Sequence, residues 1–148
     1  MSRRWSKLQT RLYNLMDKSV DMQIHCALYE MNSNDGWHGN KLPRYWVTIG
    51  KNIVFDYPKN FVGTKVGEIQ HYPYITDIED ISNLIESYIQ RPVEDILTPF
   101  EKDKWGITNI LRVCDRRVGK RSLRKLRDVT TDDVLLGVID KRLGELAV

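Results

Sequence analysis

Residues 20–29 read Val-Asp-Met-Gln-Ile-His-Cys-Ala-Leu-Tyr, and this stretch decides the fold class. Apolar side chains occupy every second position, which is the period of a strand with one buried face. The same alternation returns over residues 45–49, and residues 53–57 form a third apolar run. Because only a short turn at residues 50–52 separates the last two runs, we expect them to form a hairpin, with the first strand paired to the second.

The segments around these strands differ in character. Residues 32–41 are rich in Asn, Gly, Ser and Asp, and they predict a loop between the first two strands. Residues 65–69 predict a short fourth strand. Ahead of the sheet, residues 2–16 carry apolar side chains at helical spacing with basic residues between them. This pattern predicts an amphipathic helix.

From Thr76 onward the chain is predicted to be helical. Thr76 and Glu79 have the spacing of a capping box, and the helix that they begin should end before Pro92. A short helical turn is expected at residues 93–97. Three more helices follow, the first closed by Gly119 and the last by Gly144. Their apolar residues are Ile107, Ile110, Leu111, Cys114 and Val118; Leu123 and Leu126; and Val134, Leu135, Val138, Ile139 and Leu143.

This order of elements predicts an α+β fold. An N-terminal helix and an antiparallel meander of three to four strands precede about four helices, whereas a parallel doubly wound sheet would require alternating strands and helices. The 148 residues are 41% hydrophobic and 29% charged, the balance of one ordinary globular domain. We expect a single domain over residues 1–148, with the helix and sheet in 1–75 and the helical part in 76–148.

The sequence also predicts a cytoplasmic protein with no membrane partner. The basic N-terminus has no apolar run behind it, and no apolar stretch approaches the roughly 20 residues that cross a bilayer. The two cysteines, Cys26 and Cys114, fall on apolar stripes, which favours two buried free thiols. A reactive or metal-binding thiol is the less favoured alternative, and a disulfide between them stays open.

No catalytic constellation is visible, so we expect a non-enzymatic protein without cofactor or metal. The histidines His25, His38 and His71 are not spaced for a shared metal, and the residues 63–67 lack the order of a phosphate-binding loop. Paired carboxylates fall in the first turns of predicted helices, where they complement the helix dipole. Sequence leaves open whether a cysteine meets His71 in space.

Trp37 and His38 form the one candidate recognition loop. They are flanked by Asn, Asp and Gly residues, where a large aromatic side chain has no apolar neighbours in sequence. An exposed tryptophan can serve as a binding platform. The alternative, which we favour, is that the indole folds back over the edge of the sheet.

Charge is distributed unevenly along the chain. The stretch 112–127 carries a charge of +7, with Asp115 as its only acid, and the stretch 77–103 carries −6. The basic residues are Arg112, Arg116, Arg117, Lys120, Arg121, Arg124, Lys125 and Arg127. These eight are the candidate nucleic-acid-binding residues, because clustered cations neutralise phosphates.

Two functions therefore compete. The first is non-specific binding of DNA or RNA by the basic stretch. The second is a protein-interaction module, such as an immunity or accessory protein, that uses the acidic stretch 77–103 or a homodimer surface. A standard helix-turn-helix does not fit, since Asp115 and Lys125 stand where that motif needs a small and an apolar residue around Gly119.

Several strings in the chain resemble a known family. They are Pro43-Arg44-Tyr45-Trp46, Phe55-Asp56-Tyr57-Pro58, Trp105-Gly106-Ile107-Thr108-Asn109-Ile110-Leu111, Asp115-Arg116-Arg117-Val118-Gly119-Lys120-Arg121 and Leu123. Together they resemble a family of small uncharacterised bacterial proteins of the kind carried in mobile gene cassettes and accessory loci. The resemblance implies a bacterial single-domain protein and brings no activity with it. In such a family, Asp115, Arg116 and Arg117 are expected to form a helix cap or a buried ion pair, because arginine suits bidentate carboxylate pairing.

Overall fold

The computed structural model describes residues 5–30, 41–57 and 75–144. The elements, in order, are α1 (Trp5–Tyr13), β1 (Met22–Glu30), β2 (Lys41–Ile49), β3 (Asn52–Tyr57), α2 (Ile75–Gln90), the short 3₁₀ helix η3 (Val93–Asp95), α3 (Ile107–Cys114), α4 (Lys120–Val129) and α5 (Asp133–Leu143). A helix, three strands and then a group of helices confirm the predicted α+β fold. The predicted fourth strand at residues 65–69 lies outside the described residues.

The three strands form an antiparallel sheet in the order β1-β2-β3. Ile24 pairs with Val47 across β1 and β2, and Tyr45 pairs with Tyr57 across β2 and β3. The hairpin between β2 and β3 turns at Gly50, whose φ of 58° lies in the left-handed region that favours glycine. Both predicted strand pairings are therefore confirmed. The strand β2 begins at Lys41, earlier than the alternation over 45–49 indicates, because it continues to pair with the end of β1.

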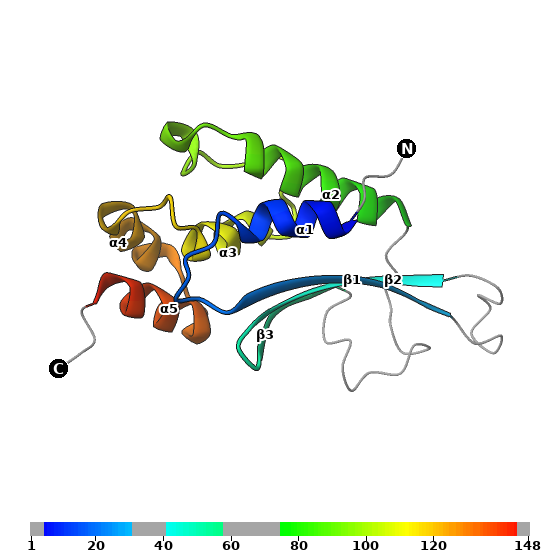
Figure 1. The fold of residues 1–148 in the computed structure, drawn as a ribbon, viewed down its shortest axis with the longest axis horizontal. Helices are drawn as coiled ribbons and strands as arrows, with labels where there is room; N and C mark the ends of the chain where they lie inside the picture. The colour runs from blue at the N-terminus through cyan, green and yellow to red at the C-terminus, as the bar shows by residue number, and fades with distance from the viewer. Residues whose placement is uncertain (1–4, 31–40, 58–74, 145–148) are drawn as a thin grey trace.

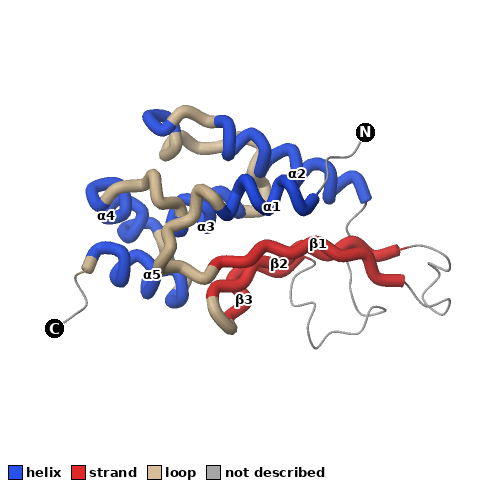
Figure 2. Tube along the Cα trace, viewed as in Figure 1, coloured by secondary structure: helices blue, strands red, loops and turns tan. Residues whose placement is uncertain are grey.

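The helices α1 and α2 lie side by side over one face of the sheet, and α4 and α5 lie beyond one end of it (Figures 1 and 2). The alternation along β1 and β2 turns Ile24 and Val47 toward these helices, where both are fully buried. Leu12 of α1 and Ile85 of α2 meet them in one hydrophobic core. Burial of this core is the main source of stability.

The end of α3 differs from the prediction, and the difference matters for the site. The apolar spacing predicts a helix through Val118 that is closed by Gly119, but α3 ends at Cys114. Asp115 turns to an extended conformation (φ −79°, ψ 123°) and pairs with Met16, which follows α1. Gly119 instead precedes α4 as its N-cap, with an ordinary φ of −83°. The predicted cap at Gly144 is confirmed, since its φ is 68° at the end of α5.

Candidate functional site

The eight basic residues of the stretch 112–127 separate into two groups in the structure. Arg112, Arg116, Arg117 and Arg127 make hydrogen bonds or ion pairs with other parts of the chain. Lys120, Arg121, Arg124 and Lys125 lie exposed on α4, and Arg124 among them also interacts with another part of the chain. The single charge cluster seen in the sequence therefore divides into four arginines that hold other segments of the chain in place and four exposed cations on α4.

Arg112 belongs to the interior. Its side chain runs from α3 to the segment after η3, where Nε donates to the carbonyl of Ile96 at 2.8 Å and Nη2 donates to the carbonyl of Thr98 at 2.7 Å. A segment without regular structure leaves its carbonyls without partners, and a buried carbonyl needs a donor. The role of Arg112 is thus to hold residues 96–98 in place.

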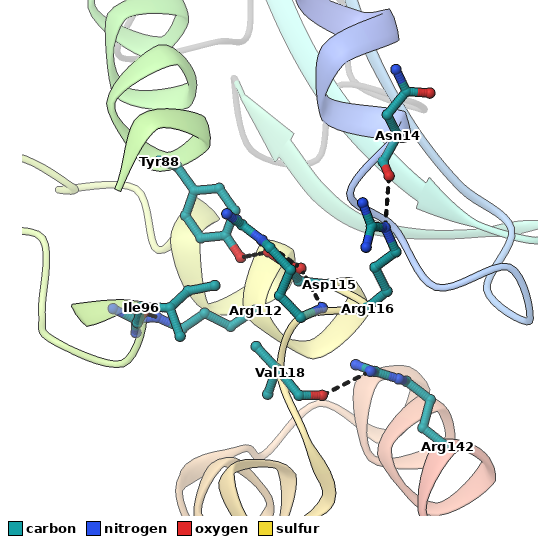
Figure 3. A network of polar contacts seen from close by, with 9 residues as sticks. Asn14, Tyr88, Ile96, Arg112, Asp115, Arg116, Val118 and Arg142 are labelled. Atoms are coloured by element: carbon teal, nitrogen blue, oxygen red, sulfur yellow. Dashed lines mark hydrogen bonds and ion pairs between the residues drawn. The ribbon is translucent and has the colours of Figure 1, made fainter. Parts of the chain in front are cut away.

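Asp115 is the centre of a buried polar network, which Figure 3 shows. It is 0% exposed, and its carboxylate accepts hydrogen bonds from the hydroxyl of Tyr88 at 2.6 Å and from the backbone N–H of Arg117 at 2.8 Å. The guanidinium of Arg117 pairs with the same carboxylate at 2.8 Å. Burial, and then the charge of Asp115, hold the pKa of Tyr88 above its usual value, so the phenol remains a donor. The expected buried ion pair is confirmed for Asp115 and Arg117.

Two further arginines connect distant segments around this network (Figure 3). The Nε of Arg116 donates to the carbonyl of Asn14 at 2.9 Å. Arg142 of α5 donates to the carbonyls of Val113 at 2.8 Å and Val118 at 2.9 Å. The exit of α3 is therefore fastened to the N-terminal helix and to the C-terminal helix, which explains why an Asp-Arg-Arg string stands there.

The exposed set occupies one side of α4. Since a helix turns by about 100° per residue, Lys120, Arg121, Arg124 and Lys125 fall within an arc of about 140°. Leu123 and Leu126 lie on the opposite side and are buried. Asp128, also exposed, adds one acid at the C-terminal end of the arc. The surface of α4 is thus a strip of four cations on a helix fixed by its apolar side.

The charges in the first turn of α4 are of the sign that the helix dipole disfavours at this end. Lys120 and Arg121 stand in this turn, which contains no acid, and the N-cap Gly119 provides no side-chain hydrogen bond. Two cations therefore lie close to the free backbone N–H groups and to the positive end of the helix dipole, which is unfavourable. Each such cation costs stability, and a bound anion would relieve the conflict.

The ion pairs of Arg117 and Arg127 do not reach the acidic stretch 77–103. Arg127 pairs with Asp140 of α5 at 2.6 Å, and Arg117 pairs with Asp115, both outside the acidic stretch. Within the acidic stretch, Glu86 pairs with Arg11 of α1. The carboxylate of Asp103 accepts from the backbone at the start of α3.

Of the histidines and the recognition-loop residues singled out in the sequence, His25 lies in the described part of the chain, whereas His71 does not. Trp37 and His38 lie outside that part of the chain. The ring of His25 stacks on Trp46 at 4.8 Å, and burial, followed by the charge of Arg44, lowers the pKa of His25. Among residues 5–30, 41–57 and 75–144, no three His, Cys, Asp or Glu side chains are grouped to hold a metal.

Both cysteines are free thiols. Cys114 is buried in the core, and Cys26 is half-buried in β1. Burial raises the pKa of Cys114 to about 12 and also raises the pKa of Cys26. A raised pKa leaves little thiolate at neutral pH, so the structure agrees with the core role predicted for both residues.

A cleft that no sequence pattern indicated lies in the helical part of the structure. It lies between one side of α2 and residues 98–105, has a volume of about 830 Å³, and includes Arg91, Phe100, Lys102 and Trp105 in its lining. The available signal was two aromatic residues, Phe100 and Trp105, in a stretch without helical or strand period. Aromatic side chains in such a stretch either anchor it to the core or line a pocket, and here they do both.

Comparison with known proteins identifies a family and nothing beyond it. No helix in the described part of the chain is long and apolar enough to cross a membrane. Searches of curated proteins and of solved structures return no match. The family model of the SF0329 protein family matches residues 4–75 and 65–143, which together span nearly the whole chain. The chain therefore belongs to the SF0329 protein family.

Proposed function

We propose that this protein binds nucleic acid non-specifically through the exposed strip of α4 defined by Lys120, Arg121, Arg124 and Lys125. The observation that carries the proposal is the first turn of α4, where Lys120 and Arg121 stand without an acid in the turn beside the free backbone N–H groups of the helix start. A sequence that places cations where they destabilise their own helix is best explained by an anion that binds there.

The chemistry of the strip suits a phosphate backbone rather than particular bases. Lysine and arginine cations on one side of a helix can each approach a phosphate oxygen, and counterions are released as they do so. Among the described residues, the strip carries no aromatic or amide side chain for reading base edges. The binding is therefore electrostatic, tolerant of sequence, and weakened steeply by salt.

A matched pair of variants tests the proposal. The first is the triple variant Lys120→Ala, Arg121→Ala, Lys125→Ala, and the control is Lys7→Ala, Lys18→Ala, Lys51→Ala. Both remove three exposed cations, but the control removes them outside α4. Fluorescence anisotropy with labelled duplex DNA, single-stranded DNA and RNA is recorded across a salt series.

The wild type and the control should bind with the same dependence on salt. The α4 variant should lose up to about 2.7 from the slope of log K against log salt on duplex DNA, at roughly 0.9 per phosphate contact. Equal effects of the two triple variants would show that net charge alone is responsible. Absence of binding by the wild type at low salt would end the proposal.

A protein-interaction module is the second candidate function. It is favoured by the turn η3, where Val93 is 50% exposed and is followed by the exposed acids Glu94 and Asp95. An apolar residue beside carboxylates suits a partner with a basic rim around an apolar pocket. Substituting Val93→Ser together with Glu94→Gln and Asp95→Asn would abolish such a complex and leave nucleic-acid binding unchanged.

The resemblance to a bacterial family adds expectations about the location, the genetic origin and the oligomeric state of the protein. We infer a cytoplasmic protein of bacterial accessory or cassette loci, either acting alone or as a homodimer. Membership of the SF0329 family supports the resemblance itself. Fractionation of cells that express the native gene, followed by detection of the protein with an antibody, tests the cytoplasmic placement.

A further inference from the structure

The cleft beside α2 has two walls of different construction. One wall is a single side of the helix, since Asp80, Leu84, Ser87 and Arg91 recur at intervals of three or four residues. The other wall is the connection from α2 to α3, residues 98–105, which folds back beside the helix (Figure 2, tan). The volume of about 830 Å³ falls within the range of small-molecule sites, about 300–1,000 Å³.

The irregular wall is held in place by side chains from both sides. Arg112 donates to the carbonyls of Ile96 and Thr98 from within the core, and Arg91 donates to the carbonyl of Thr98 at 3.0 Å from the helix. At the other end of the wall, the Asp103 carboxylate accepts from the backbone N–H groups of residues 105–108 and from the hydroxyl of Thr108. Because these bonds already order residues 98–105, the binding of a ligand would not cost the conformational entropy of ordering them.

The lining combines flat aromatic surface with cations. The rings of Phe100 and Trp105 are half-buried against the core. The guanidinium of Arg91 lies 3.6 Å from the ring centre of Phe100, and the ammonium of Lys104 lies 5.0 Å from that of Trp105. Exposed Lys102 adds a third cation. Such a lining attracts a flat ring that carries an anionic group.

The two walls of the cleft also offer hydrogen-bonding groups that bind no other described residue. The side chains of Asp80, Ser87 and Lys102 make no hydrogen bond or ion pair with any residue in the described ranges. A carboxylate accepts from amino groups, and a hydroxyl both donates and accepts. These are the groups that recognise the polar edge of a heteroaromatic ring.

We propose that this cleft binds a heteroaromatic ring joined to a phosphate, the class of compound to which nucleoside monophosphates belong. The ring stacks on the guanidinium plane of Arg91, which lies over Phe100, while Lys102 and Lys104 meet the phosphate and Asp80 and Ser87 meet the polar edge of the ring. The site is separate from the strip on α4 and stands without it. Acidic peptides fit less well, because Asp80 and Glu101 would oppose a chain of carboxylates.

Isothermal titration calorimetry with AMP, GMP, CMP and UMP tests the proposal on the full chain. At least one nucleotide should bind with a Kd below about 1 mM, equivalent to −4.1 kcal/mol. Ribose 5-phosphate and the matching nucleoside should each bind at least tenfold more weakly, because each lacks one of the two recognised groups. Absence of heat with all four nucleotides, or equal binding of ribose 5-phosphate, would overturn the proposal, as would binding of an acidic peptide in their place.

Two variants locate the site. The double variant Lys102→Ala, Lys104→Ala should weaken the nucleotide at least tenfold and leave the nucleoside unchanged, whereas the control Lys7→Ala, Lys51→Ala should change neither. All four lysines are exposed, so both variants should fold. The triple variant on α4 should retain nucleotide binding, which separates the two proposals. A loss in the α4 variant instead of the cleft variant would refute the assignment to the cleft.

Discussion

The hydroxyl of Tyr88 and the carboxylate of Asp115 lie 2.6 Å apart in a position that solvent does not reach. Tyr88 comes from α2 and Asp115 from the exit of α3, so this one hydrogen bond joins the layer over the sheet to the C-terminal helices. The guanidinium of Arg117 completes the coordination of the carboxylate. Buried charge is tolerated in proteins when it is paired and hydrogen-bonded in this way.

Removing the members of this network should destabilise the fold by different amounts. Tyr88→Phe removes one donor and should cost about 1–3 kcal/mol, since the carboxylate loses a partner that water cannot replace. Asp115→Ala leaves the guanidinium of Arg117 without its partner and should cost about 3–5 kcal/mol. Urea denaturation followed by circular dichroism measures both. The exposed variant Asp128→Asn is the control and should stay within about 0.5 kcal/mol of wild type.

Cys114 should be inert until the protein unfolds. Burial raises its pKa to about 12, so almost no thiolate exists at about pH 8, and the core excludes the reagent. In a Cys26→Ala variant, reaction with Ellman's reagent should be slow in buffer and complete in urea. Equal rates in the two conditions would show that Cys114 is accessible in the folded state.

The sheet could be predicted because its signal is local. A strand with one buried face must alternate, so residues 22–28 carry the period in their own order. The end of α3 could not be predicted in the same way. Val118 follows Cys114 at helical spacing, and only the pairing of Asp115 with Met16, about a hundred residues away in sequence, shows where the helix stops.

The sequence predicts the excess of positive charge at residues 112–127, but it does not predict which of these basic residues contact other parts of the chain. Arg112 and Arg116 stand four residues apart and belong to one side of the helix that the pattern predicts. Both hold other segments in place, since Arg112 is buried against the carbonyls of Ile96 and Thr98 and the exposed Arg116 donates to the carbonyl of Asn14. These roles depend on where Asn14 and residues 96–98 fold, which no local pattern records.

The two groups of cations should therefore respond oppositely to substitution. Arg112→Ala leaves the Ile96 carbonyl without its donor and the Thr98 carbonyl with Arg91 alone, so it should cost about 1–3 kcal/mol, while the salt slope of nucleic-acid binding stays unchanged. Arg121→Ala should change stability by less than about 0.5 kcal/mol and reduce that slope by about 0.9 on duplex DNA. Denaturation and anisotropy on the same two proteins give all four values. A reduced slope in the folded Arg112→Ala protein would contradict the division of the basic residues into those that support the fold and those that bind nucleic acid.

His25 should make the fold less stable in mild acid. Burial and then the charge of Arg44 lower its pKa below the ordinary 6.5, so the unfolded chain takes up a proton before the folded protein does. The stability that neutral His25 contributes is complete above about pH 6.5, and it is lost as the pH falls from 6.5 through the lower pKa of His25 in the folded protein. Between about pH 7.5 and about pH 5.5, the wild type should lose more stability than His25→Gln. Proton NMR of the imidazole should give a midpoint below 6.5, and a midpoint above it would refute this account.

Reversing charge in the first turn of α4 should strengthen the fold and abolish its proposed function. In Lys120→Glu, Arg121→Glu, two carboxylates replace two cations at the positive end of the helix dipole, and each should contribute about 0.3–1 kcal/mol. The same carboxylates repel phosphate, so nucleic-acid binding should disappear. A raised Tm in thermal denaturation together with lost anisotropy would show that the wild type keeps these cations at the expense of stability. If stability falls as well, Lys120 and Arg121 serve the fold, and their place in the first turn of α4 is no sign of a bound anion.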